Sequence, residues 1–218
     1  MKFRRKSAES EPTPEVVDDT APADSGEQGV AVERTGPFDV DDMPETAQER
    51  VDLGALVIEP EPGRELRLQV DESTGEVQAV VLAGADGAVE LRAFAAPRNG
   101  DLWSEVRPAI AADMAQHGGV ATEREGRFGT ELICQVPVRR EDGSAATQPS
   151  RIIGINGPRW MLRATLLGRP ALDVESSGAW EETIAKIAVR RGDVAMPVGD
   201  ALTVVLPDNA RRLDPPTA

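Results

Sequence analysis

Hydrophobic and polar residues alternate clearly from residue 65 onward. Leu66, Leu68 and Val70 fall on one side of this segment, with charged or amide side chains between them. A period of two is typical of a strand with one buried face. Similar apolar runs predict further strands at residues 77–83, 89–94, 130–138, 151–155, 159–167 and 202–206.

Short turn signals separate several of these runs. Asp86-Gly87 and Asn156-Gly157 are pairs that favour tight hairpins. Residues 142–149 are polar and predict a longer loop. Because strands joined by short turns pair antiparallel, we expect a mainly antiparallel sheet.

Helical spacing occurs first between residues 101 and 117. Asp101 is a suitable N-cap residue, and the glycines after His117 are suitable for the end of a helix. Pro108 lies inside this segment, so the helix is either kinked there or begins there. Its expected apolar face consists of Trp103, Val106, Ile110 and Met114.

A second helix is predicted at residues 179–189, with Ser176 or Ser177 as its N-cap residue. Glu182 and Lys186 have the spacing of a supporting ion pair on this helix. Strands, a helix, more strands and a helix thus follow one another. This order predicts an α+β fold, a mainly antiparallel sheet with two main helices packed on it, similar to a Mog1/PsbP-like α-β-α sandwich.

Charge divides the chain into parts. Residues 7–49 contain thirteen Asp and Glu against one basic residue, Arg34, and few apolar side chains. Such a composition buries too little apolar area to offset the entropy of ordering. We therefore expect a disordered acidic arm at residues 1–50, a single α+β domain at residues 51–207 and a flexible tail at residues 208–218.

One part of the arm differs from its surroundings. Phe38, Val40 and Met43 are apolar residues within an acidic stretch that begins at Gly36. One interpretation is a docking segment that contacts the domain or an unknown protein partner. The other is a solvated linker with a few stray apolar residues.

The sequence also bears on location and on partners. Arg4, Arg5 and Lys6 precede glutamates and prolines rather than the apolar stretch of a signal peptide. No run approaches the ~20 apolar residues of a membrane span, so we expect a cytoplasmic protein with no membrane contact. From residue 51 on, 25 acidic residues outnumber 18 basic ones, which argues against direct nucleic-acid binding.

Catalytic and metal-binding patterns are sparse. The chain has one histidine, His117, expected to cap a helix end, and one cysteine, Cys134, expected to be a buried structural thiol. Neither a zinc site nor a glycine-rich phosphate loop can be built from the sequence. We predict no metal and no cofactor, and the lack of an activated nucleophile argues against an enzyme.

The arginines are the residues of this sequence best suited to bind a ligand. From residue 51 on, there are seventeen arginines and one lysine. Guanidinium groups bind carboxylates and phosphates in a bidentate manner. The predicted anion-binding rim consists of Arg98, Arg107, Arg159 and Arg163. The alternative is that they are ordinary surface arginines paired with nearby carboxylates.

Four separated phrases resemble one known family. They begin at Leu91 (LRAFAAPR), Leu102 (LWSEVR), Phe128 (FGTEL) and Gly157 (GPRW, followed by Leu162 and Arg163). Together they are similar to the actinobacterial family called domain of unknown function 3710, over about residues 36–207. The resemblance implies a bacterial cytoplasmic protein and brings no activity, substrate or catalytic residue.

Two functions follow as hypotheses. The first is a non-enzymatic interaction or accessory module that uses the acidic arm. The second is a small-anion or nucleotide-binding domain that uses the arginine rim.

Overall fold

The computed structural model describes residues 36–46, 48–140, 142–173, 175–207 and 210–211. The acidic residues before position 36 and most of the predicted tail lie outside this set. The predictions of a disordered arm and a flexible tail therefore stay predictions for those residues.

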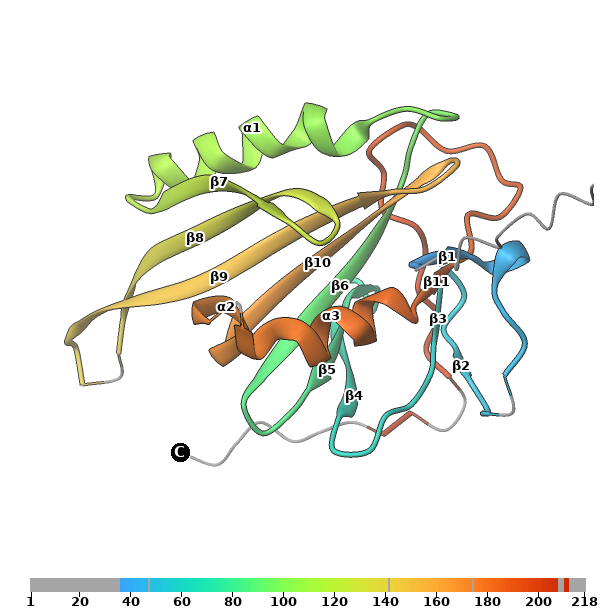
Figure 1. The fold of residues 1–218 in the computed structure, drawn as a ribbon, viewed down its shortest axis with the longest axis horizontal. Coiled ribbons are helices and arrows are strands. Elements are labelled where there is room, and N and C mark those ends of the chain that lie inside the picture. Colours follow the sequence, from blue (N-terminus) through green and yellow to red (C-terminus); the bar gives the residue numbers. More distant parts are fainter. Residues whose placement is uncertain (1–35, 47, 141, 174, 208–209, 212–218) are drawn as a thin grey trace, which may run out of the picture. The chain divides into compact units, whose positions relative to one another are not determined.

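A seven-stranded sheet forms the centre of the domain (Figure 1), and its strand order is β4-β5-β6-β10-β9-β8-β7. All neighbours in this order pair antiparallel. The strands are β4 (Glu65–Val70), β5 (Val77–Ala83), β6 (Gly87–Ala95), β7 (Val120–Gly126), β8 (Gly129–Arg139), β9 (Ala145–Asn156) and β10 (Trp160–Gly168).

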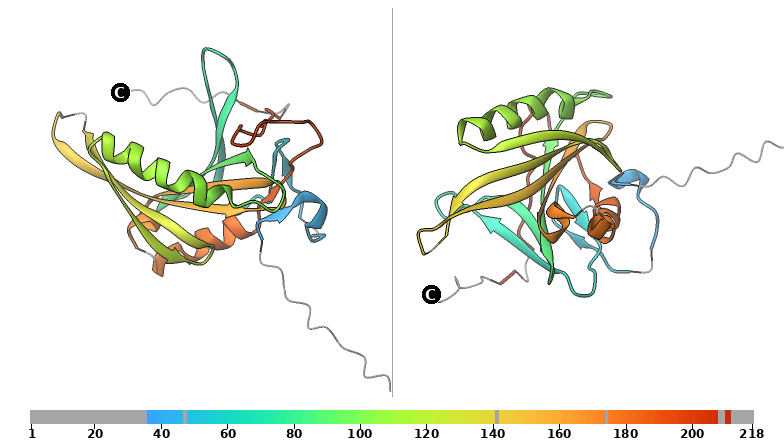
Figure 2. Two further views of the ribbon diagram at one scale, coloured as in Figure 1. Left: turned by 90° about the horizontal axis from the view of Figure 1, so that it is seen from above. Right: turned by 60° about the vertical axis from the view of Figure 1, so that its left-hand side comes forward.

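Helices cover both faces of this sheet (Figures 1 and 2). On one face lies α1 (Leu102–Gln116); on the other lie α2 (Arg169–Leu172), the short 3-10 helix η2 (Glu175–Ser177) and α3 (Gly178–Ala185). The fold is α+β with a mainly antiparallel sheet, as the sequence predicts.

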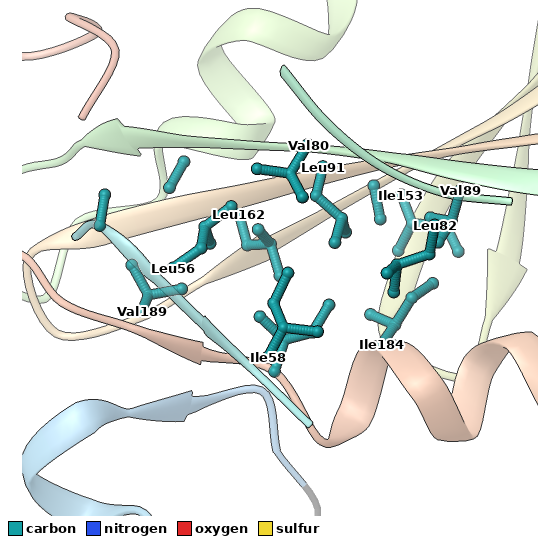
Figure 3. Packing of buried hydrophobic residues seen from close by; sticks show 14 of the residues in the cluster. Leu56, Ile58, Val80, Leu82, Val89, Leu91, Ile153, Leu162, Ile184 and Val189 are labelled. Atoms are coloured by element: carbon teal, nitrogen blue, oxygen red, sulfur yellow. The ribbon is translucent and has the colours of Figure 1, made fainter. Parts of the chain in front are cut away.

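Alternation along β10 separates two apolar clusters. Leu162 and its neighbours at every second position pack toward Ile184 of α3 in the larger cluster, which Figure 3 shows. Met161 points to the opposite face and packs with Trp103 of α1. We call the side of the sheet on which Met161 lies the α1 face.

A second, small sheet has the strand order β1-β11-β3-β2. Leu56 and Ile58 of β3 and Val189 of β11 contribute to the larger cluster (Figure 3). The small sheet thus packs on the same face as α3. Its strands are β1 (Phe38–Asp39), β2 (Val51–Asp52), β3 (Leu56–Ile58) and β11 (Ala188–Val189).

The described fold includes residues ahead of the Val51 boundary that the composition predicts. Phe38 pairs in parallel with Ala188, and the Phe38 N–H donates to Ile187 O (2.9 Å). The Trp160 Nε1–H donates to Asp39 Oδ2 (2.9 Å). Backbone pairing and the hydrogen bond from the buried Trp160 indole fix this segment, and its acidic composition predicts neither contact.

The first helix is continuous through Pro108 and begins at Leu102, so the alternative of a start at Pro108 is wrong. Asp101 caps it, since its side chain accepts from the Ser104 N–H (3.0 Å). Pro108 cannot donate to the Ser104 carbonyl, but both residues are exposed, so water can serve that carbonyl.

Three other boundaries differ from the prediction. The second helix ends at Ala185, because Ala188 and Val189 are buried as β11 between β1 and β3. β9 begins at Ala145 inside the predicted loop, where it pairs with Arg139 of β8. Residues 202–206 form no strand: Ala201 bridges Phe94 and Val204 bridges Gly54 instead.

Candidate anion-binding site

Two arginines lie side by side at the centre of the main sheet. Arg92 of β6 and Arg163 of β10 are direct partners in the antiparallel register. Both lie on the α1 face, because Met161 and Phe94 on that face are two residues away along the same strands. The sheet register therefore brings together two like charges that are far apart in the sequence.

Phe94 holds the two guanidinium groups together. The Arg92 Cζ lies 5.6 Å and the Arg163 Cζ 5.3 Å from the centroid of its ring. Cations are attracted to an aromatic ring at this range. The pair thus has an apolar support on one side.

Trp103 borders the pair on the β9 side. Gly154 is the β9 partner of Arg163, and a Cβ built on Gly154 would lie 2.0 Å from Trp103 Cδ2. The indole therefore occupies the place of the missing side chain beside Arg163. Its Nε1–H donates to Thr130 O (2.6 Å), which fixes the ring.

No carboxylate of the described residues forms an ion pair with Arg92 or Arg163, although the charge of Glu90 acts on Arg163. Among the arginines that the structure describes, these are the two that are half-buried or deeper and hold no oxygen in an ion pair or hydrogen bond. The Arg92 Nε is shielded from solvent without a hydrogen-bond partner. Five other arginines also have a nitrogen that is shielded from solvent, but each of them forms an ion pair or a hydrogen bond with an oxygen: Arg50, Arg64, Arg124, Arg151 and Arg191.

The electrostatics of Arg163 reflect this setting. Burial lowers the pKa of its guanidinium, the charge of Arg92 lowers it further, and the charge of Glu90 opposes both. An anion between the two guanidinium groups would offset the cost of their desolvation and reduce their mutual repulsion.

The rest of the predicted rim is only partly assembled. Backbone hydrogen bonds from Ala96 to Arg159 and from Asn99 to Pro158 (both 2.9 Å) place the segments of Arg98 and Arg159 side by side. Arg98 is exposed, and the Arg159 Nη2 donates to Gly192 O (3.2 Å).

Arg107 is engaged elsewhere. Its Nε donates to Glu123 Oε1 of β7 (2.8 Å), so it fits the alternative of an ordinary ion pair. The predicted rim omits Arg92, the direct neighbour of Arg163. The signal that would have found it is the β6–β10 register, which places the arginine of the LRAF phrase opposite Arg163.

The predicted docking segment lies on its own domain. Phe38, Val40 and Met43 are all half-buried, and Val40 belongs to a 3-10 helix, η1 (Val40–Asp42). Whether these residues also bind a partner stays a prediction.

A second charged cluster lies on the opposite face and has all its charges paired. Arg151 is 1% exposed, and its Nη2 lies 2.7 Å from Glu131 Oε2 and 2.6 Å from Glu181 Oε1. Its Nη1 donates to Ser177 Oγ (2.8 Å). Burial opposes the charged form, yet the hydrogen bonds to both carboxylates raise the pKa of Arg151. This cluster ties α3 to the sheet rather than forming an open site.

The acidic residues of α3 take partners outside the helix. Glu181 contacts buried Arg151, because the helix turns it toward the sheet. Glu182 and Lys186 form their ion pairs with other residues: Arg127 Nη1 (2.6 Å) for Glu182 and Glu61 Oε1 (2.9 Å) for Lys186. The hydrogen bond to Glu61 raises the pKa of Lys186, and the charge of Glu182 adds to this shift.

The residues considered for catalysis have structural positions. Cys134 is fully buried, and burial raises the pKa of its thiol to about 11, with a hydrogen bond to Ser150 opposing the shift. The prediction of a buried thiol is confirmed. His117 is the C-cap residue of α1, as expected, and its Nδ1 lies 2.8 Å from Asp113 O.

The described part of the chain has neither a cluster of metal-ligand side chains nor a helix suited to span a membrane. Its His, Cys, Asp and Glu side chains form no group of three or more that could hold a metal ion. None of the helices there is both long and apolar enough to cross a membrane.

A family model described as "Protein of unknown function (DUF3710)" matches residues 36–212. The chain belongs to this family. The resemblance drawn from the four phrases is thereby confirmed, and the match to the DUF3710 family includes β1 and both arginines of the central pair. No curated protein matches this DUF3710 member.

Two solved structures are similar to this DUF3710 protein in part. A protein from Bacteroides thetaiotaomicron VPI-5482 aligns with 11% identity and a TM-score of 0.40, over 67% of this chain and 50% of that chain. The chain thus spans half the length of that protein. PsbP (CyanoP) from the cyanobacterium Synechocystis sp. PCC 6803 aligns with 13% identity and a TM-score of 0.35, over 66% of this chain and 94% of that chain.

Proposed function

We propose that this domain is a non-enzymatic, cytoplasmic binding module whose ligand is a small anion held between Arg92 and Arg163. The observation that carries the proposal is the half-buried guanidinium pair, which forms no ion pair or hydrogen bond with a described residue. Two like charges in such a place repel each other and lose hydration, so the free domain bears a cost that a bound anion offsets.

The chemistry of the pair favours an oxyanion. A guanidinium presents its N–H groups as a fork that matches a phosphate or a carboxylate. Two forks on neighbouring strands would hold one oxyanion between them, with the rings of Phe94 and Trp103 beside them. The low local dielectric strengthens each charged hydrogen bond.

The positions of the cysteine and the histidine support a non-enzymatic role. The thiol of Cys134 is buried with a raised pKa, and His117 lies at the C-terminal end of α1. An interaction through the acidic arm remains the second proposal, and its acidic residues before position 36 lie outside the described part of the chain.

Binding of inorganic phosphate and pyrophosphate, measured by isothermal titration calorimetry at low ionic strength, tests the proposal. We expect Arg163→Gln to weaken binding about tenfold or more, because a hydrogen bond to a charged group contributes roughly 1.5–3 kcal/mol. The matched control is Arg67→Gln. Arg67 belongs to β4 and lies on the same face of the sheet, but it is exposed and already paired with Glu65 (2.6 Å).

A thermal melt of each variant separates lost binding from lost folding. Arg163→Gln should melt at or above the wild-type temperature in the absence of anion, because it removes a repulsive, desolvated charge. Absence of binding heat with both anions in the wild type, or equal affinity in Arg163→Gln, would contradict the proposed function.

A further inference from the structure

A second pair of polar side chains adjoins the arginines. Glu90 of β6 and Thr165 of β10 are direct register partners, two residues along their strands from Arg92 and Arg163. Residues two apart on a strand share a face and lie about 6.7 Å from each other. The four side chains therefore form a two-by-two block on the α1 face.

In the part of the chain that the structure describes, Glu90 and Thr165 have no contact partner for their polar side-chain atoms, although the charge of Glu90 acts on Arg163. Both are half-buried, and within the described residues neither side chain takes part in an ion pair or hydrogen bond. Ala88 and Leu167 continue the same face beyond them and are also half-buried. The block thus has a cationic end and an end with a carboxylate and a hydroxyl.

The charges of the block define the charge of its ligand. Two guanidinium groups and one carboxylate give the block a net charge of +1. A bare phosphate satisfies the arginines but brings negative charge toward Glu90, which repels it. A phosphate monoester that also carries an ammonium group has a net charge close to −1 and places opposite charges at both ends.

We infer that the ligand is a small aminoalkyl phosphate, with its phosphate between Arg92 and Arg163 and its ammonium group at Glu90 and Thr165. This inference rests on the proposed function, because it assigns the phosphate to the same arginine pair. Glu90 supplies the charge, and the Thr165 hydroxyl accepts a hydrogen bond from the ammonium group. The end formed by Glu90 and Thr165 then sets specificity.

Three matched probes test the inference by calorimetry: ethyl phosphate, 2-hydroxyethyl phosphate and 2-aminoethyl phosphate. We expect the amino compound to bind about tenfold more tightly than ethyl phosphate, the effect of one charge-assisted hydrogen bond. In Glu90→Gln this preference should disappear, while ethyl phosphate binds as well as before or better, because a repulsive carboxylate is gone. Glu65→Gln, at an exposed pair on β4, should leave all three affinities unchanged.

The outcomes separate the two proposals. If ethyl phosphate and 2-aminoethyl phosphate bind equally well, or if the preference for the amino compound survives in Glu90→Gln, the aminoalkyl assignment is wrong. The proposed anion site is not affected by either result. Tightest binding of the hydroxy compound overturns the aminoalkyl assignment in favour of a hydroxylated phosphate ester. Binding of none of the three to the wild type contradicts the proposed function itself.

Discussion

Replacement of Arg151 by alanine is expected to destabilise the domain by about 3–5 kcal/mol, the usual effect of stranding a buried charge. Glu131 is fully buried and would keep only Arg124, whose Nη2 lies 2.9 Å from Glu131 Oε1. Ser177 and Glu181 would lose their link from α3 to the sheet. Urea unfolding followed by circular dichroism measures the change.

Two further variants show whether the stranded carboxylate causes the loss. Adding Glu131→Gln to Arg151→Ala should recover part of the stability, because a neutral amide is less costly to bury than a carboxylate. Arg67→Ala removes an exposed arginine with its ion pair and should stay close to the wild type. A loss in Arg151→Ala no larger than in Arg67→Ala would refute this account of the cluster.

The second large effect is expected for Gly154→Ala. A Cβ at this position would meet three atoms of the Trp103 indole at 2.0–2.5 Å, far inside contact distance. Either Trp103 gives up its hydrogen bond to Thr130 O or β9 shifts, and overpacking of this kind typically costs about 1–3 kcal/mol, occasionally more. Because Trp103 borders Arg163, anion binding should weaken as well.

Gly178→Ala is the matched control for that substitution. Nothing lies within 4 Å of a Cβ built on Gly178, which begins α3. Alanine should therefore be neutral or slightly stabilising there. In a double-mutant cycle, Trp103→Leu should offset part of the loss in Gly154→Ala, since it removes the clashing ring. Additive losses would show that the indole is not the cause.

The sequence predicts those elements whose burial repeats regularly. The strand around Leu66 alternates half-buried with exposed positions, and β10 alternates buried with half-buried positions from Leu162 onward, so their period is visible. The sequence does not mark the start of β9, because the hairpin around Ala145 is mostly exposed on both sides and has no such period. It does not separate β11 from α3 either, because Ile184 and Ile187 continue a helical spacing into Ala188.

The site was only half predictable for a similar reason. Arg163 was chosen for its residue type and its place near Trp160, but nothing local marks Arg92 as its neighbour. That relation depends on the register of two strands about 70 positions apart, which sequence periodicity does not contain. The sequence does not show which arginines form ion pairs either. Arg107 of α1 pairs with Glu123 of β7, whereas no carboxylate pairs with Arg163 in the described residues.

The pairing of β1 with β11 has a kinetic consequence. It joins Phe38 to Ala188 across most of the domain's length and involves only two residues in each strand. Contacts between residues so far apart in the sequence form slowly, and they stabilise the chain little until the main sheet has formed. We expect β1 to dock after the main sheet has formed, so Phe38→Ala should speed unfolding and leave refolding almost unchanged in stopped-flow measurements. A slowed refolding rate would instead place this short parallel contact in the folding nucleus.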